Sequence, residues 1–397
     1  MGEKLLLAQS GGATAVINGS LSGAIEAAQR SGRFDAIIGA RNGIDGVLNG
    51  AFIDLERQPK SVLSLLRRTP SAALGTTRRK LSDDAAVQAL AVLRAHDIHA
   101  FAYIGGNDSA DTAMRLGGLA RDAGYPLRVV SIPKTIDNDL EGTDHCPGYG
   151  SIARFLALAT RDAGLDTEAT QALYPVKLIE VMGRHAGWVA AATALGQLEP
   201  EEAPQLIFFP ERPPRDLDHF LSEIQQTYER FGRVVAVVPE TLRDVAGAPI
   251  AGDGVAWTDP FGHQYTPGPG PGLTRAIEAQ LGLRARFDKP GTIARMYSDS
   301  LSETDLAEAV LAGATAIDLL VQGISGVMVT LERTSDDPYQ VRAGSVDLAQ
   351  VANRERLLPD DFIGPDGRSV TPAFRHYALP LIDGPLPPVA RLVDITP

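Results

Sequence analysis

Two aspartates, a lysine and a threonine stand close together in the stretch SIPKTIDNDL, at the end of the apolar run PLRVVSIP. Lys134 and Thr135 come first, and Asp137 and Asp139 follow at alternate positions. In an extended turn, alternate side chains point to opposite sides, so the two carboxylates would have different neighbours. A carboxylate that accepts a proton, beside a second that holds a metal ion or a sugar hydroxyl, is what transfer of phosphate to a hydroxyl requires. The alternative is a hydrogen-bonded turn of the Asx type, formed by Asp137, Asn138 or Asp139.

Glycine-rich motifs follow two other apolar runs. In QSGGATAVING, Gly11 and Gly12 precede a predicted helix, whose N-terminal N–H groups and dipole favour an anion. In GGNDSADT, Asn107 and Asp108 stand at the start of another predicted helix. A tight turn without a ligand explains the first motif equally well, and Asp108 or Ser109 acting as a helix N-cap explains the second.

Charged side chains end two further runs and one loop. EVMGRHAGW places Arg184, a rigid fork suited to phosphate or sugar hydroxyls, behind a strand, and His185 is interpreted as structural. VVPET places Glu240 at another strand end. The segment LGTTRRK, from Thr76 to Lys80, forms either a local anion site or an exposed basic turn.

Short apolar runs rich in Val, Ile and Leu alternate with segments of helical spacing along the whole chain. This alternation predicts an α/β fold with parallel sheets that helices cover on both faces. In such sheets ligands bind outside the carboxyl ends of the strands, which is where the motifs above lie. The segment TPGPGPGL (266–273) is expected to be a loop, and YALPLIDGPLPP an extended strap on the surface.

The composition limits the possible classes of protein. The chain has 397 residues, of which 44% are hydrophobic, and one cysteine, so we expect two domains, no internal disulfide and a reducing, cytoplasmic location. A formal net charge of -12 argues against a nucleic-acid or acidic-membrane binder. No apolar stretch is long enough to span a bilayer, so we expect no membrane partner.

The motifs, taken together and in this order, resemble the phosphofructokinase family over nearly the whole chain. The blocks that carry the resemblance are SGG, LGTTR, GGNDS, PKTIDNDL, TDHCPGYGS, EVMGR, VVPE and PGTIAR. The resemblance implies two Rossmann-like, three-layer α/β/α domains with mainly parallel sheets and an active site in the cleft between them. We expect residues 1–137 with 252–305 to form the phosphate-donor domain, and 138–251 with 306–397 the sugar-phosphate domain, with a C-terminal strap crossing back.

Two positions separate the phosphate donors within this family. ATP-dependent members have glycine where this chain has Asp108, and usually glycine where it has Lys134, so both residues match the pyrophosphate-dependent branch. A carboxylate at Asp108 would repel the α-phosphate of ATP, whereas pyrophosphate ends before that point. Lys134 would supply positive charge to the transferred group.

The resemblance also implies roles for individual residues. Asp137 would be the base that deprotonates the 1-hydroxyl of fructose 6-phosphate, with Lys134, Asp108 and Thr135 completing the catalytic set. The sugar phosphate would be bound by Thr135, Ile136, Asp137, Asp139, Met182, Gly183, Arg184, Glu240, Arg286, Thr292 and Arg295. Pyrophosphate would be bound by Gly11, Gly12, Arg78, Lys80, Gly106 and Lys134, and Mg²⁺ by Asn107 and Asp139. Arg286 would reach across from a neighbouring subunit, which implies a homodimer or homotetramer.

Some positions depart from the family pattern. Asn107 replaces the usual acid of the metal site, Thr292 replaces a histidine near the 6-phosphate, and Pro175 stands where an arginine is expected, with Lys177 nearby. No extra arginine pattern indicates an allosteric nucleotide site. Three alternatives stay open: a broader kinase that also accepts sedoheptulose 7-phosphate, a catalytically silent regulatory member, and a dinucleotide oxidoreductase. The last is disfavoured because the first turn lacks the G-x-G-x-x-G spacing.

Overall fold

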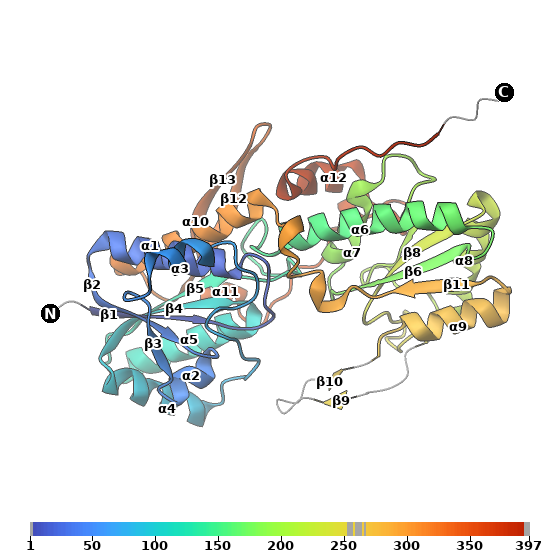
Figure 1. The fold of residues 1–397 in the computed structure, drawn as a ribbon. Helices are drawn as coiled ribbons and strands as arrows, with labels where there is room; N and C mark the ends of the chain where they lie inside the picture. Colours follow the sequence, from blue (N-terminus) through green and yellow to red (C-terminus); the bar gives the residue numbers. More distant parts are fainter. Residues whose placement is uncertain (1–2, 252–256, 259–263, 266, 393–397) are drawn as a thin grey trace.

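The computed structural model describes residues 3–251, 257–258, 264–265 and 267–392, and it has two lobes, each built around its own sheet (Figure 1). The larger sheet has seven strands in the order β13 (Tyr339–Asp347), β12 (Val327–Asp336), β5 (Arg128–Pro133), β4 (Ile98–Gly105), β1 (Glu3–Gln9), β2 (Phe34–Ala40) and β3 (Phe52–Asp54). The smaller sheet has four strands in the order β11 (Ala285–Asp288), β6 (Val176–Val181), β8 (Val234–Pro239) and β7 (Leu206–Ile207). Within these two sheets, β13 pairs antiparallel with β12 and β3 pairs antiparallel with β2, and all other neighbouring strands are parallel. The mainly parallel α/β fold is therefore confirmed.

Helices cover both faces of each sheet. On the larger sheet, α1 (Ile17–Ser31) and α10 (Glu303–Val321) pack together on one face, and α2 (Ile44–Leu48), α4 (Asp83–Ala95), α5 (Asn107–Asp122) and α11 (Leu348–Val351) lie on the other. On the smaller sheet, α6 (Tyr149–Thr170), α7 (Trp188–Ala192) and α12 (Pro372–Ala378) oppose α8 (Leu217–Phe231) and α9 (Gly270–Leu281). The short helix α3 (Lys60–Leu66) has no buried residue, and the remaining pair, β9 (Trp257–Thr258) and β10 (Gln264–Tyr265), is antiparallel. Each lobe thus has three layers, α/β/α.

The alternation of side chains along the buried strands explains this layering. In β1, Leu5 and Leu7 belong to the core under α1 and α10, whereas Leu6 and Ala8 belong to the core under α4 and α5. All four residues are fully buried. A strand that is apolar at every position must be covered on both faces, which is why these runs read as continuous rather than alternating.

The division of the chain between the lobes differs from the one expected from the sequence. We expected 252–305 in the first domain, but α9 and β11 join the second lobe, where β11 pairs with β6. We expected 306–397 in the second domain, but α10, β12, β13 and α11 join the first, where β12 pairs with β5. α10 belongs to the first lobe because it packs closely against α1. The two helices approach so closely that a Cβ atom at Gly313 of α10 would lie 2.0 Å from the carbonyl oxygen of Ser20 of α1.

Two local expectations were also wrong in part. The segment TPGPGPGL is not all loop, because Gly270 already begins α9 with Pro271 in its first turn; Thr266 lies outside the described residues. The strap begins later than expected, since α12 and a 3₁₀ turn at Leu379–Ile382 cover its first part. Thr371 caps α12 by accepting a hydrogen bond from the backbone N–H of Phe374.

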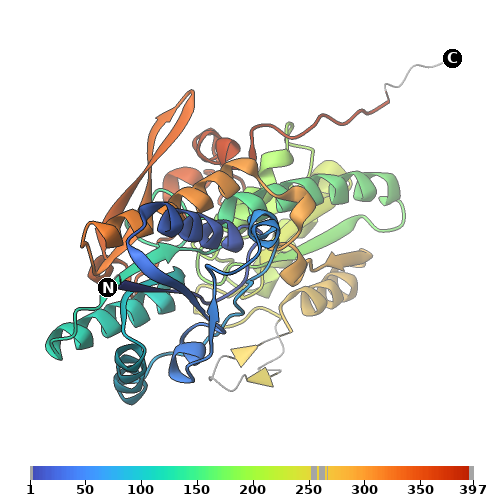
Figure 2. The ribbon, with the colours of Figure 1, turned by 60° about the vertical axis from the view of Figure 1, so that its left-hand side comes forward.

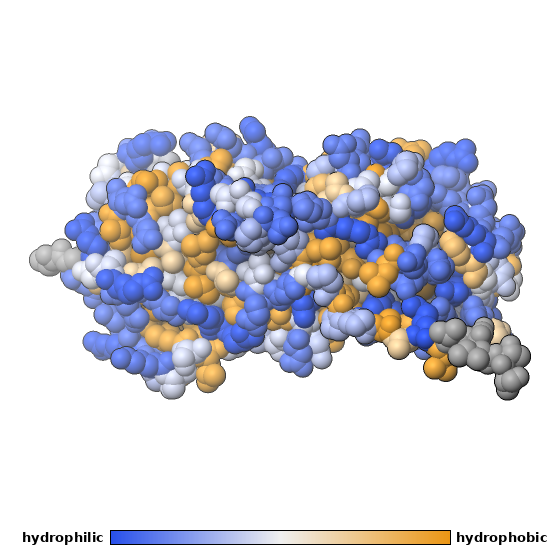
Figure 3. Space-filling model, turned by 90° about the horizontal axis from the view of Figure 1, so that it is seen from above, coloured by the Kyte–Doolittle hydropathy of each residue, from blue (hydrophilic) through white to orange (hydrophobic). Residues whose placement is uncertain are grey.

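Figure 2 shows the hairpin of β12 and β13 rising from the edge of the larger sheet. Figure 3 shows one face of the molecule, on which polar residues predominate and apolar residues form small scattered groups. Within the described ranges, no helix is both long and apolar enough to cross a membrane.

Candidate active site

A cavity of about 400 Å³ lies where the carboxyl ends of strands from both lobes face each other. Its lining contains most of the residues singled out in the sequence: Gly11, Gly12, Arg78, Lys80, Gly106, Asn107, Asp108, Lys134, Thr135, Ile136, Asp137, Asp139, Met182, Gly183, Arg184, Glu240 and Arg295. The ends of β1, β4 and β5 supply the residues from 11–12, 106–108 and 134–139, and those of β6 and β8 supply Met182 to Arg184 and Glu240. Arg78 and Lys80 come from the loop before α4, and Arg295 from the segment after β11.

Asp137 and Asp139 both line this cavity, although alternate residues of an extended turn would point apart. The reason is Asn138, which lies between them in the left-handed conformation with φ of 55°. This conformation turns the side chain of Asn138 into the protein, where it is fully buried and hydrogen-bonded to Tyr377 and to the backbone of Cys146. The expectation of opposite directions was therefore wrong, and the turn delivers two carboxylates to one site.

Lys134 sits against the glycine turn that follows β1. Its Nζ donates to the carbonyl oxygen of Gly12 at 2.8 Å, and the residue is only 3% exposed. A Cβ atom at Gly11 would lie 3.0 Å from Lys134 Nζ and one at Gly12 would lie 2.6 Å from Arg295 Nη1, so a side chain at either position would displace one of these two cations. Gly11 also has φ of 77°. The two glycines leave room for two cations, which makes this turn suited to an anion.

The N-terminus of α5 forms another part of the cavity wall, at the first-lobe end. Asp108, in the first turn of α5, lies 3.5 Å from Lys80, and both side chains are more than half exposed. An exposed pair of this kind contributes little stability. Asn107 differs, because its Oδ1 atom is buried and has no hydrogen-bond partner in the described part of the chain.

The second lobe contributes a pair of opposite charges. Arg184 and Glu240 approach to 3.8 Å (Nε to Oε1), and the carbonyl oxygen of Arg184 accepts a hydrogen bond from Thr241. Arg295 lies on the segment that crosses between the lobes, where its carbonyl oxygen accepts the N–H of Ala15 at 2.8 Å. The first-lobe end of the cavity therefore carries cations together with the carboxylates of Asp108, Asp137 and Asp139, and the second-lobe end carries the pair of Arg184 and Glu240.

The electrostatic environment favours a general base at neutral pH. Burial, followed by the carboxylates of Asp139 and Glu240, raises the pKa of Asp137 to about 7, against the opposing effects of Arg184 and Lys134. Burial, followed by repulsion from Arg295, lowers the pKa of Lys134 to about 8. Burial also raises the pKa of Asp139. A base with a pKa near the working pH is efficient in proton transfer.

Two expected site residues lie away from the cavity. Arg286, on β11, is exposed and stacks over the ring of Tyr174 at 3.8 Å. Thr292 lies in an exposed 3₁₀ turn three residues before Arg295. Neither side chain lines the site of this single chain.

The cavity also contains residues that were not assigned a binding role from the family resemblance, although Thr77 and Arg79 belong to the segment LGTTRRK, for which an anion site was one of the two expectations. The additional lining residues are Ser10, Thr77, Arg79, Ser109, His185, Ala186 and Glu355. His185 Nδ1 and Glu355 approach to 2.9 Å at the rim. Nothing in the sequence around Glu355 marks it, because it follows α11 and reaches the site only through the tertiary fold. His185, which was interpreted as structural, comes directly after the EVMGR motif. Its position behind that motif is the sequence signal from which its place in the cavity could have been predicted.

The donor set of the cavity fits a hard cation only in part. Asn107 Oδ1 and the carboxylate of Asp139 are oxygen ligands of the kind that Mg²⁺ takes. In the described ranges, however, no three His, Cys, Asp or Glu side chains come together in a metal-binding group. A metal ion in this cavity would need further oxygens from a ligand or from water.

A glycine-lined, cation-rich cavity that also holds a carboxylate of raised pKa is the site of a phosphotransferase. The family model described as "Phosphofructokinase" matches residues 4–320, so the chain belongs to the phosphofructokinase family. The resemblance drawn from the motifs is thereby confirmed.

Relatives agree with this assignment over most of the chain. A pyrophosphate--fructose 6-phosphate 1-phosphotransferase of Xanthomonas campestris pv. campestris is 41% identical, covering 96% of this chain and 92% of the relative. A protein of the same name from Methylococcus capsulatus is 39% identical, covering 95% and 91%. The crystal structure of a pyrophosphate-dependent phosphofructokinase from Nitrosospira multiformis superposes with a TM-score of 0.88 at 38% identity, covering 98% of this chain and 94% of that one.

Proposed function

We propose that the protein transfers phosphate reversibly between pyrophosphate and the 1-hydroxyl of fructose 6-phosphate, giving fructose 1,6-bisphosphate and phosphate. The observation that carries the proposal is the position of Asp137, a carboxylate whose pKa is raised to about 7, in one cavity with the buried Lys134. The names of relatives that cover more than nine tenths of the chain support the choice of substrates.

In the forward direction Asp137 takes the proton of the 1-hydroxyl as that oxygen attacks the transferred phosphorus. A bond forms from the sugar oxygen to phosphorus, the bridging P–O bond of pyrophosphate breaks, and the electron pair leaves with inorganic phosphate. Lys134, Arg78 and the glycine turn would neutralise the charge on the two phosphate groups. Because Lys134 is held at 2.8 Å from the carbonyl oxygen of Gly12, this charge is positioned before the substrate binds.

The sugar phosphate would occupy the second-lobe end of the cavity. Arg295, which lies on the segment between the lobes with its Nη1 close to Gly12, would bind the 6-phosphate where the two ends of the cavity meet, since a guanidinium pairs with phosphate in a bidentate manner. Glu240 and Arg184 would bind the sugar hydroxyls, and Thr135, Ile136, Asp139, Met182 and Gly183 would complete the pocket. The reacting hydroxyl would then lie between Asp137 and the donor.

Asp108 would exclude nucleotides from the donor site. It lies in the first turn of α5, beyond the glycine turn and next to Lys80. A carboxylate there repels a third phosphate group, whereas pyrophosphate has only two. Gly106, at the start of the same helix, and Lys80 would contact the end of the pyrophosphate.

We propose Mg²⁺ as the cofactor. Asn107, with its buried and unpartnered Oδ1, and Asp139 would hold it together with pyrophosphate oxygens. The ion would neutralise charge on the donor. We also propose a cytoplasmic location, which the single cysteine favours.

We propose that a second copy of the chain completes the sugar-phosphate site in a homodimer or a larger homo-oligomer. Arg286 and Thr292 are exposed and lie outside the cavity of their own chain. If Arg286 acts across an interface, mixing inactive Asp137→Asn chains with impaired Arg286→Ala chains creates hybrids with one intact site, and activity rises above that of either variant. No rise upon mixing, with refolding to allow exchange, would place Arg286 outside the neighbour's site.

The reaction can be tested by identifying its products. Incubation with fructose 6-phosphate, pyrophosphate and Mg²⁺ should yield, by ³¹P NMR, a new phosphate ester on C1 and one equivalent of inorganic phosphate. Release of two equivalents of phosphate without a new ester would instead indicate a pyrophosphatase, and no change would reject the proposal.

The two shifted pKa values predict a bell-shaped pH profile for kcat/KM. Asp137 must be ionised, so activity should rise through a pH of about 7, and Lys134 must be protonated, so activity should fall above about 8. Glu240→Gln removes a neighbouring negative charge and should move the acid limb to lower pH. A profile that is flat from pH 6 to 9 would contradict the assignment of both groups.

A further inference from the structure

The turn that carries Asp137 and Asp139 is held from behind by Arg356, a residue that does not line the cavity. The guanidinium of Arg356 donates from Nε and Nη2 to the carbonyl oxygen of Asn138, at 3.2 and 2.9 Å. Its Nη1 donates to the carbonyl oxygens of Thr143, at 2.9 Å, and Asp144. The backbone N–H of Arg356 donates to the carbonyl oxygen of Asp139 at 2.8 Å. One side chain thus joins the two ends of the loop 138–144.

This set of contacts from Arg356, called the clamp below, acts at Asn138, whose backbone conformation is unfavourable. Asn138 has φ of 55°, a left-handed conformation that is unfavourable for an L-residue, although Asn adopts it more readily than most. In an unrestrained turn, position 138 would relax toward extended geometry, and Asp137 and Asp139 would then point apart. The bidentate contact from Arg356 fixes the carbonyl oxygen of Asn138 in the direction that the left-handed conformation requires.

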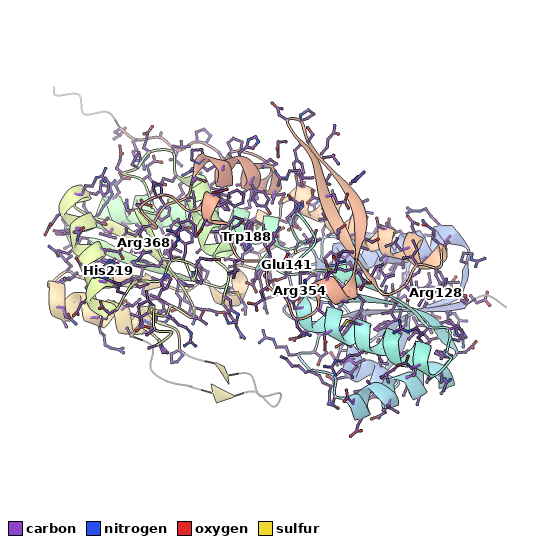
Figure 4. All side chains as sticks on the ribbon, turned by 180° about the vertical axis from the view of Figure 1, so that it is seen from behind. Arg128, Glu141, Trp188, His219, Arg354 and Arg368 are labelled. Carbon is purple, nitrogen blue, oxygen red and sulfur yellow. The ribbon has the colours of Figure 1, made fainter. Side chains whose placement is uncertain are left out.

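Arg356 is itself held rigidly. Its guanidinium carbon lies 4.4 Å from the ring centroid of Trp188, and Trp188 Nε1 donates to the carbonyl oxygen of Arg356 at 3.1 Å. Trp188 is 1% exposed and belongs to the core of the second lobe. In Figure 4, Trp188, Glu141 and Arg354 lie near the junction of the two lobes. The clamp therefore ties the turn of the first lobe to the core of the second.

We propose that Arg356 is a positioning residue for phosphoryl transfer, which fixes the turn at Asn138 so that the carboxylates on either side of it face the substrates. This inference rests on the proposed function. A planar fork is needed to bind two carbonyl ends of a loop at once, and the point charge of a lysine cannot replace it.

The test compares Arg356→Lys with a matched control, Arg368→Lys. Arg368 is a buried arginine, whereas Arg356 is half-buried, but like Arg356 it stacks over an aromatic ring, that of Phe208 at 4.6 Å, and it donates to Glu223 and to the carbonyl oxygens of Arg212 and Gly367. It lies in the second lobe, well away from the junction (Figure 4). Both substitutions remove comparable contacts and should lower the melting temperature by a similar amount.

Only Arg356→Lys should change catalysis. We expect kcat to fall by about 10–100-fold, as for a misplaced catalytic group, with KM for fructose 6-phosphate within about threefold of the wild type. Added methylguanidinium should partly restore kcat in Arg356→Ala, since it replaces the missing fork. Equal kcat in Arg356→Lys and Arg368→Lys, or a change confined to KM, would overturn the proposal.

A second measurement separates this inference from the proposed function. If the wild type transfers no phosphate from pyrophosphate, the proposed function fails before any variant is compared. Hydrogen–deuterium exchange of the peptide 134–140 still tests the clamp, because exchange should accelerate at least about tenfold in Arg356→Lys and stay unchanged in Arg368→Lys. Equal protection in both variants would show that Arg356 does not hold the turn.

Discussion

Replacement of Asp137 by asparagine should lower kcat by about 10³–10⁴-fold and leave KM for fructose 6-phosphate nearly unchanged. Asparagine has the same shape as aspartate and can still accept a hydrogen bond from the substrate, but it cannot take the proton. The loss therefore falls on the transition state alone. Steady-state kinetics at pH 8, where the wild-type carboxyl is ionised, measures both constants.

Asp139→Asn is the matched control for this experiment, since it changes the other carboxylate of the same turn. We expect a smaller loss in kcat, about 10–100-fold, together with a lower pKa for Asp137 because a neighbouring negative charge is gone. If Asp139→Asn proved as damaging as Asp137→Asn, or if Asp137→Asn mainly raised KM, Asp137 would be a binding residue rather than the base.

The same substitution should increase stability at neutral pH. The pKa of Asp137 is about 7 in the folded protein and near its ordinary value of 3.8 in the unfolded chain. The protonated carboxyl of Asp137 therefore contributes its full share to the free energy of unfolding below about pH 4. This contribution is lost as the pH rises through about 7, because ionisation of the carboxyl in the folded site is unfavourable. Asparagine removes this cost, so the melting temperature at pH 8 should rise by about 2 °C, whereas at pH 4 it should not.

Replacing both Asp108 and Lys134 by glycine should transfer donor preference from pyrophosphate toward ATP. Lys134 is buried and its ammonium group faces the glycine turn, so its loss should lower kcat/KM for pyrophosphate by about 10²–10³-fold. Removal of the Asp108 carboxylate takes away the repulsion against a third phosphate group, and activity with ATP should then become measurable.

The two single variants separate these effects. Asp108→Gly alone should admit ATP with a modest change for pyrophosphate, and Lys134→Gly alone should lose pyrophosphate activity without a gain for ATP. Arg121→Ala is the control, because Arg121 lies on α5 outside the cavity in an exposed pair with Asp122, and kcat/KM with pyrophosphate should stay unchanged. Unchanged donor preference in the double variant would show that these two positions do not select the donor.

Much of this site could be predicted because its residues lie directly behind apolar strands. The carboxyl ends of parallel strands meet at one edge, so Gly12, Asp108, Lys134 and Asp137 could be brought together from the sequence alone. The direction in which Asp137 and Asp139 point could not be predicted from the sequence. It depends on the left-handed conformation of Asn138, which tertiary contacts from Arg356 and Tyr377 maintain.

Features that depend on distant packing were predicted less well. The run SGVMVTLE, which contains the start of β12, reads as an apolar strand, whereas β11, with the sequence ARFD, does not. Periodicity does not say which sheet a strand joins, and both segments were assigned to the wrong lobes. Glu355 lines the cavity from a segment without regular pattern, and Arg286 lies on the surface of its own chain.

The most direct test of the central claim is the ratio of kcat/KM for pyrophosphate to that for ATP, measured from initial rates with saturating fructose 6-phosphate and Mg²⁺. A short donor site, bounded by Asp108 and neutralised by Lys134, predicts turnover with pyrophosphate and a ratio of at least about 10³, the size expected for charge repulsion in a partly buried site. Faster turnover with ATP, or equal rates with both donors, would contradict the account of these two residues.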